Sequence, residues 1–211
     1  MNVIIFGATG GIGKWAVKHA LEKGYQVTAY VRSPDKVKQQ DEHLTVIKGE
    51  ISDYETMHSA LKGQDAVIWC VGIPMKNKLV HLESKKGHEN LLRAMNETGV
   101  KRLIDWGTPS IHFEKDAKSF ITVVPGIMAG ILFSRAKDEM VSIGEMLKSS
   151  DLDWTLVRFM APKDSAYKGT VKVGFGDVKM NFAISREDIG AFMVEQVESS
   201  QYIRSMPIIG S

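Results

Sequence analysis

The chain has 211 residues, of which 44% are hydrophobic and 25% are charged, and its 27 basic and 25 acidic side chains leave a formal net charge of +2. This balance is typical of a folded globular protein and excludes a disordered or fibrous one. The basic residues are spread along the chain, so we expect neither nucleic acid nor a membrane surface as a partner. Cys70 is the only cysteine, which excludes an intramolecular disulfide.

The length favours a single domain over residues 1–211. The first residues form an apolar run, Val3–Phe6, without the basic stretch and cleavage site of a secretory signal, so we predict a cytoplasmic protein. The longest apolar stretch, Phe120–Phe133, is interrupted only by Thr122, contains Pro125, Gly126 and Gly130, and is too short and too broken to span a bilayer as a helix.

Short β-branched runs alternate with helical patterns along most of the chain. Brief apolar runs bounded by turn residues or charges predict strands at Val3–Phe6, Gln26–Val31, Leu44–Ile47, Ala66–Val71, Leu103–Asp105 and Trp154–Val157. Helical periodicity predicts helices at Ile12–Lys23, Pro34–Gln39, Tyr54–Leu61, Val80–Glu97 and Arg135–Ser149. This alternation favours a parallel sheet covered on both faces, the doubly wound α/β class or Rossmann fold.

The C-terminal part departs from this alternation. Lys163–Gly176 is polar and contains glycines, and it precedes a predicted helix at about Arg186–Glu198 and a last strand at about Tyr202–Ile209. We interpret this part as a small lobe on the substrate side, followed by a return to the core. Ligands of doubly wound sheets bind beyond the carboxyl ends of the strands, so we expect the chemistry in the loops there.

A glycine-rich turn, Gly7–Gly13, follows the first predicted strand and opens the first predicted helix. Gly7 permits a tight turn, Gly10 removes a Cβ from the path of a phosphate, and Gly13 lets the helix pack close to the strand. The helix start adds free N–H groups and a partial positive charge. This context predicts a dinucleotide whose pyrophosphate is bound by Gly7, Thr9, Gly10, Gly11, Ile12 and Gly13.

The end of the second predicted strand decides which dinucleotide is preferred. An acidic residue there would bind a ribose 2′-hydroxyl, whereas an arginine would accommodate a 2′-phosphate. This chain has Arg32 and Ser33, with no carboxylate before Asp35. The pattern favours NADP(H) as the cofactor, and the alternative is that Arg32 is a solvated surface residue.

Further motifs extend the pattern over nearly the whole chain. They are Arg32–Lys36, Gly49–Asp53, Gly63–Ile68, Gly99–Arg102, Ser150–Arg158 and Ile184–Gly190, together with Gly7–Gly13. In these segments the chain resembles the atypical short-chain dehydrogenase/reductase group. That group consists of small NAD(P)H-binding proteins, among them biliverdin reductase B (flavin reductase)-like and NmrA-like members. The resemblance implies a Rossmann fold and a nicotinamide cofactor.

The resemblance also implies individual cofactor contacts. Glu50 and Ile51 match a segment beside the adenine, and Val71 and Gly72 match a segment beside the ribose and nicotinamide. Glu50 stands where the family usually has Asp, so its contact with the adenine would differ in geometry. Arg158, at the end of the sixth predicted strand, is also expected to contact the cofactor.

Related reductases carry a Tyr-x-x-x-Lys pair, and the best match here is Phe133 with Lys137. The match implies that Lys137 holds the nicotinamide ribose, whereas Phe133 cannot donate a proton. Thr108 matches a serine or threonine that hydrogen-bonds the substrate carbonyl, and its alternative role is a turn hydroxyl before Pro109. The catalytic candidates are therefore Thr108 and Lys137. The six histidines show no ligand pattern, so we expect no metal site.

Two functions follow from these expectations. The first is an NADPH-dependent reductase that passes hydride to a flat conjugated acceptor such as a flavin, quinone-like compound or tetrapyrrole, which tolerates a missing acid. The second is a non-catalytic NADP(H)-binding redox sensor, which the absent tyrosine favours. The apolar stretch Phe120–Phe133 is interpreted either as a wall or lid over an apolar acceptor, or as an interface or core insert.

Overall fold

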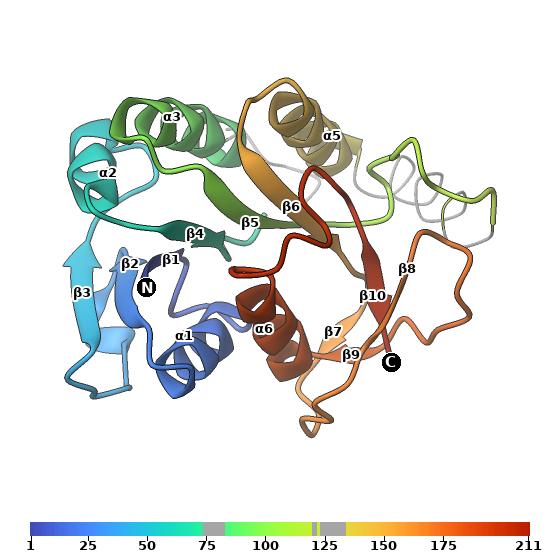
Figure 1. Ribbon diagram of the computed structural model, residues 1–211, viewed down its shortest axis with the longest axis horizontal. Helices are drawn as coiled ribbons and strands as arrows, with labels where there is room; N and C mark the ends of the chain where they lie inside the picture. Colours follow the sequence, from blue (N-terminus) through green and yellow to red (C-terminus); the bar gives the residue numbers. More distant parts are fainter. Residues whose placement is uncertain (74–82, 120–121, 123–133) are drawn as a thin grey trace.

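The computed structural model describes residues 1–73, 83–119, 122 and 134–211, and it places a central sheet between two layers of helices (Figure 1). The strands of this sheet are β1 (Asn2–Phe6), β2 (Gln26–Val31), β3 (Leu44–Lys48), β4 (Ala66–Trp69), β5 (Arg102–Gly107), β6 (Asp153–Arg158), β8 (Lys172–Gly174) and β10 (Ile208–Gly210). They lie in the order β3-β2-β1-β4-β5-β6-β10-β8. Neighbours pair in parallel except β10 with β8, which is antiparallel. The predicted doubly wound α/β class is confirmed.

The helices cover both faces of the sheet (Figure 1). One layer consists of α2 (Tyr54–Leu61), α3 (Glu83–Thr98) and α5 (Ser134–Lys148), and the other consists of α1 (Gly13–Glu22) and α6 (Arg186–Glu195). A separate short pair of parallel strands, β7 (Pro162–Lys163) and β9 (Ile184–Ser185), lies next to α6. No helix within the described ranges is long and apolar enough to cross a membrane.

The central strand β1 shows why a continuous apolar run forms a strand here. Val3 and Ile5 pack into the core beneath α1 and α6, whereas Ile4 and Phe6 pack into the core beneath the other helical layer. All four side chains are fully buried. A parallel strand with helices on both sides needs apolar residues at every position rather than at alternate ones.

Two helix starts are fixed by side-chain caps. The carboxylate of Asp53 accepts a hydrogen bond from the N–H of Thr56 at the start of α2, at 3.1 Å. The hydroxyl of Ser185 accepts one from the N–H of Glu187 at the start of α6, at 3.2 Å. Each cap satisfies a backbone donor that the helix itself leaves without a partner.

Three predicted elements differ from the structure. The helix predicted at Pro34–Gln39 is wrong, because only a short 3-10 turn forms at Pro34–Lys36, with no side-chain cap and no buried residue to hold a longer helix. The last strand is limited to Ile208–Gly210, since Arg204 adopts a left-handed conformation with φ 51° and Pro207 has no N–H to pair. Part of the predicted C-terminal lobe instead extends the main sheet as β8.

The strand order reverses beside β1 and so locates the site. The chain runs outward from β1 to β2 and β3 and then returns to β4 on the other side of β1. A crevice therefore opens beyond the carboxyl ends of β1 and β4, where ligands of doubly wound sheets bind. The segments beyond these ends are the glycine-rich turn and residues 70–73.

Candidate functional site

The glycine-rich turn folds as its sequence predicts. Gly7 has a left-handed φ of 72°, and its carbonyl accepts a hydrogen bond from the N–H of Gly10 at 2.8 Å. A Cβ on Gly13 would lie 2.2 Å from the carbonyl oxygen of Gly7. Only glycine at position 13 lets α1 begin this close to the end of β1.

The turn leaves backbone donors available for a ligand. No hydrogen bond between the described residues uses the N–H groups of Thr9, Gly11 or Ile12. These groups precede the first turn of α1, where the helix dipole adds a partial positive charge. The arrangement is suited to an anion such as a phosphate group.

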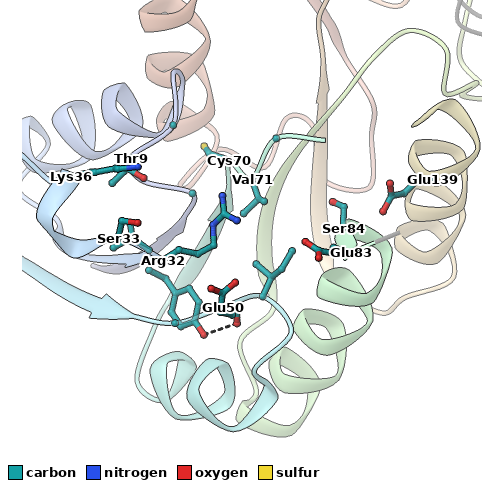
Figure 2. A pocket seen from close by; sticks show the side chains of 17 residues that line it. Thr9, Arg32, Ser33, Lys36, Glu50, Cys70, Val71, Glu83, Ser84 and Glu139 are labelled. Carbon is teal, nitrogen blue, oxygen red and sulfur yellow. Dashed lines mark hydrogen bonds between the residues drawn. The ribbon is translucent and has the colours of Figure 1, made fainter. Parts of the chain in front are cut away.

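A cavity of about 470 Å³ lies on the β2 and β3 side of the turn, and we call it the polar cavity (Figure 2). Gly7, Thr9 and Gly10 line it from the turn, and Arg32, Ser33 and Lys36 line it from the end of β2. Figure 2 shows the side chain of Arg32 extending into the cavity toward Val71. Among the described residues no carboxylate pairs with this guanidinium, so an anionic ligand group can bind it.

Tyr30 builds the next wall of the polar cavity. Its hydroxyl donates a hydrogen bond to the carbonyl of Glu50 at 3.0 Å, and a Cβ on Gly49 would lie only 2.1 Å from the same hydroxyl. Burial, together with the carboxylates of Asp53 and Glu50, raises the pKa of Tyr30 to about 12. The phenol therefore stays protonated and fixes the backbone of Gly49–Ile51 along the cavity.

A second cavity of about 420 Å³ lies on the other side of the turn, and we call it the apolar cavity. Its lining residues come from the turn, from the ends of β4, β5 and β6, and from α6: Gly10, Gly11, Ile12, Cys70, Gly72, Ile73, Trp106, Thr108, Phe159, Met160, Ala161, Pro162, Arg186 and Met193. The indole N–H of Trp106 donates to the carbonyl of Val71 at 2.9 Å, and its ring stacks on Phe159 at 5.7 Å between centroids. Thr108 and Arg186 are the polar side chains of this wall that can hydrogen-bond a bound molecule strongly.

The two cavities share Gly10, Cys70 and Gly72 as a common wall. A Cβ on Gly72 would meet no atom within 4 Å, so this glycine faces open space. Burial, with the carboxylate of Asp105, raises the pKa of the Cys70 thiol. Cys70 therefore lies beneath both cavities as a neutral side chain and not as a nucleophile.

The structure brings most of the predicted site residues together. The polar cavity is lined by Gly7, Thr9, Gly10, Arg32, Ser33, Glu50, Ile51, Val71 and Gly72. Gly11, Ile12 and Thr108 line the apolar cavity, and Gly13 supports the turn from beneath. Phe133 and most of the stretch Phe120–Phe133 lie outside the described residues.

Lys137 is placed differently from the expectation. It is half-buried on α5 and does not line either cavity, and the α5 side chain beside the Thr108 hydroxyl is Met140, with its sulfur 3.6 Å away. Thr108 also exchanges a hydrogen bond with Ser110 at 2.5 Å. The contact of Lys137 with the nicotinamide ribose stays a prediction without support from this geometry.

The structure corrects the expectation that Arg158 contacts the cofactor. Its side chain is fully buried, and its guanidinium donates to the carboxylate of Asp116 at 2.8 Å and to the carbonyls of Ile111 and Met206, each at 2.8 Å. A side chain with no exposed surface and with its donors occupied cannot contact a bound cofactor. Arg158 is therefore a structural residue that ties the loop after β5 to the segment before β10.

The lining residues that were not predicted from the sequence include four charged or polar ones, Lys36, Ser84, Glu139 and Arg186. Lys36 lies in the 3-10 turn after β2 and Arg186 is the first residue of α6, whereas Ser84 and Glu139 come from helices that approach the crevice only in the folded chain. A signal existed for Lys36, because it lies one turn beyond Arg32 in the same motif. No local pattern distinguishes Ser84 or Glu139 from an ordinary helix residue.

No group of three or more His, Cys, Asp or Glu side chains in the described part could hold a metal ion.

Comparison with known proteins identifies the class to which this site belongs. Residues 7–200 match the family model described as NAD(P)H-binding. Cinnamoyl-CoA reductase 1 of Petunia hybrida is 32% identical over 111 residues, which are 48% of this chain and 33% of that protein. The photosystem II assembly factor Ycf39 of Synechocystis sp. is 32% identical over 106 residues, 49% of this chain and 32% of that protein. A short-chain dehydrogenase/reductase from Veillonella parvula, solved in complex with NADP, matches over 100% of this chain and 94% of its own, with a TM-score of 0.77 and 16% identity.

The chain belongs to the NAD(P)H-binding family, and the resemblance to atypical short-chain dehydrogenase/reductases is confirmed. It spans about a third of the length of the two relatives named above. The described residues fit such a cofactor, because the turn offers free N–H groups for a pyrophosphate and the open face of Gly72 leaves room beside it. The cofactor class is therefore NAD(P)(H).

Proposed function

We propose that this protein is an NADPH-dependent reductase that passes hydride to a flat conjugated acceptor, such as a flavin or a quinone-like compound. The observation that supports this most directly is the pairing of a polar and an apolar cavity along one shared wall. A dinucleotide that crosses this wall would have its phosphates and adenosine on the polar side. The apolar side then remains for the nicotinamide and the acceptor.

The polar cavity supports the preference for NADPH over NADH. Arg32 and Lys36 are exposed cations at the end of β2, and Ser33 adds a hydroxyl between them. A planar guanidinium matches the geometry of a phosphate and forms charge-assisted hydrogen bonds with it. We infer that these side chains bind the 2′-phosphate.

The apolar cavity supports a flat acceptor. Trp106 and Phe159 present stacked rings, and Met160, Pro162 and Met193 supply further apolar surface. Bound NADPH supplies the hydride, and the protein's part is to hold the acceptor against it and to exclude water. The Thr108 hydroxyl lines this cavity and, with Ser110 donating to it, would donate a hydrogen bond to an acceptor oxygen or nitrogen.

A turnover assay tests the proposal. Purified protein is mixed with NADPH and, in turn, with riboflavin, FMN, a series of quinones and a series of simple aldehydes, and the loss of nicotinamide absorbance is followed. We expect turnover of flavins or quinones and little turnover of aldehydes, because aldehydes need a proton donor. Tight NADPH binding without turnover of any acceptor would instead support the redox-sensor function, and preferential turnover of aldehydes would overturn the proposed acceptor class.

A further inference from the structure

Two polar groups at the α3 and α5 side of the polar cavity are almost wholly buried. Ser84, in the first turn of α3, is 6% exposed, and Glu139 of α5 is 3% exposed, yet both line the cavity. Figure 2 shows them on the wall opposite Arg32 and Ser33. Among the residues that the structure describes, none forms a hydrogen bond with the hydroxyl of Ser84. A buried hydroxyl without a partner is unfavourable in the free protein, so a group that completes its hydrogen bond accounts for its position.

Neighbouring contacts hold both residues in place without using the Ser84 hydroxyl. The Ser84 carbonyl accepts a hydrogen bond from the imidazole Nδ1 of His88 at 2.7 Å, and Nε2 of His88 contacts the carboxylate of Asp105 at 2.9 Å. One oxygen of Glu139 accepts from the N–H of Lys85 at 2.8 Å, which joins α5 to the start of α3. The backbone around Ser84 is therefore fixed, and none of these contacts uses its hydroxyl.

The chemistry of this wall selects the part of a ligand that fits it. Glu83 and Glu139 make it acidic, so a phosphate is disfavoured here and is directed to the basic wall formed by Arg32 and Lys36. A carboxylate accepts hydrogen bonds, and a serine hydroxyl both donates and accepts them. Neighbouring sugar hydroxyls supply both functions. We propose that Ser84 and Glu139 bind the two hydroxyls of the nicotinamide-side ribose of the dinucleotide, in place of the lysine that holds a ribose in related reductases.

This inference rests on the proposed dinucleotide in the polar cavity, and Ser84→Ala tests it. The substitution removes a hydroxyl that has no partner in the described part of the chain, so the melting temperature without ligand should stay unchanged or rise. The dissociation constant for NADPH should increase about tenfold, which is the loss of one well-formed hydrogen bond. A purely structural serine would show the opposite pattern, with lower stability and unchanged affinity.

Ser150→Ala is the matched control. The hydroxyl of Ser150 donates to the carbonyl of Leu147 at 2.7 Å at the end of α5, and it does not line the polar cavity. Its removal should lower the melting temperature and leave NADPH binding unchanged. Glu139→Gln provides a second variant, because the amide oxygen still accepts from Lys85 while the charge is lost; we expect NADPH affinity to fall several-fold.

The fragment 2′,5′-ADP distinguishes the two riboses, since it contains only the adenosine half. If Ser84→Ala weakens NADPH but not 2′,5′-ADP, the nicotinamide-side ribose is bound, which supports the inference. Equal weakening of both ligands would overturn it, because the adenosine ribose of NADPH carries the 2′-phosphate and has no pair of neighbouring hydroxyls. Unchanged affinity of folded Ser84→Ala and Glu139→Gln for both ligands would overturn it and leave the proposed function standing. Failure of the wild type to bind NADPH would overturn the proposed function itself.

Discussion

At the scale of a single residue, the proposed preference for NADPH depends on Arg32. Charge-assisted hydrogen bonds to a phosphate contribute about 1.5–3 kcal/mol each. Arg32→Ala should therefore weaken NADPH binding by about ten- to a hundredfold and change NADH binding little. Isothermal titration of both cofactors into wild type and variant measures this, and the wild-type preference should decrease as salt screens the exposed pair.

Lys38→Ala is the control for this experiment, because Lys38 is exposed, carries the same charge and does not line the polar cavity. It should leave both affinities unchanged. Equal weakening of NADPH and NADH by Arg32→Ala would show that Arg32 contacts something other than the 2′-phosphate.

His88 forms a buried ionic contact whose stabilising effect depends on pH. Burial alone would lower its pKa, but the carboxylate of Asp105 and the Ser84 carbonyl outweigh this and raise it. A raised pKa in the folded state means that the stabilisation is fully present below the unfolded pKa, about 6.5, and is lost as the pH rises through the folded value. His88→Gln should cost about 3–5 kcal/mol at pH 6, as expected when one partner of a buried pair is removed.

Urea denaturation of wild type and His88→Gln at pH 6 and pH 9 checks this expectation. The difference in unfolding free energy should be smaller at pH 9. A difference that stays constant or grows with pH would show that His88 is neutral in the folded protein.

The positions of site residues could be predicted from the sequence where they depend on neighbouring residues, and not where they depend on distant partners. Residues of the turn and Arg32 line the polar cavity, and their positions follow from the residues next to them in the chain. Arg158 has the same appearance in the sequence as a binding arginine. Its actual partner, Asp116, is 42 residues away and no motif connects them.

At the level of elements, the start of α1 depends on Gly13. A Cβ at this position would lie 2.2 Å from the Gly7 oxygen and 2.8 Å from the Gly7 carbonyl carbon, and both are backbone atoms that cannot move aside. Gly13→Ala should destabilise the protein by about 1–3 kcal/mol, as overpacking does, and weaken NADPH binding through the displaced turn. Thermal unfolding and a cofactor titration measure the two effects.

Lys14→Ala in the same helical turn is the control, since Lys14 is exposed and alanine favours helix. It should leave stability and affinity nearly unchanged. A Gly13→Ala variant that matches it in both measurements would mean that α1 can shift without disturbing the turn.

Elements were predictable when their own residues determine them. β1 is a continuous apolar run, and α2 has both a capping aspartate and an apolar face, so both were located within one residue of their ends. The predicted helix after β2 failed because its start resembles a helix start while its residues bury no surface. Packing, and not local propensity, decides whether such a short segment forms a helix.

At the level of the whole molecule, the pair of Arg158 and Asp116 joins segments far apart in the sequence. Arg158 lies at the end of β6, Asp116 in the loop after β5, and the Met206 carbonyl just before β10. Asp116→Asn leaves a fully buried guanidinium without its counter-charge, which typically costs about 3–5 kcal/mol. Urea unfolding measures this, with Asp151→Asn as the control, because the side chain of Asp151 is 100% exposed. Equal stability of the two variants would contradict the structural role of Arg158.

The burial of Cys70 has a practical consequence for measuring motion in this protein. A thiolate, not a thiol, reacts with maleimides and iodoacetamides, and Cys70 is both buried and held in the neutral form. A cysteine introduced at the exposed position Gln40 should therefore be labelled by a fluorophore alone, without removal of the native one. A dye can therefore be attached at one introduced cysteine while Cys70, in the wall that the two cavities share, stays unmodified.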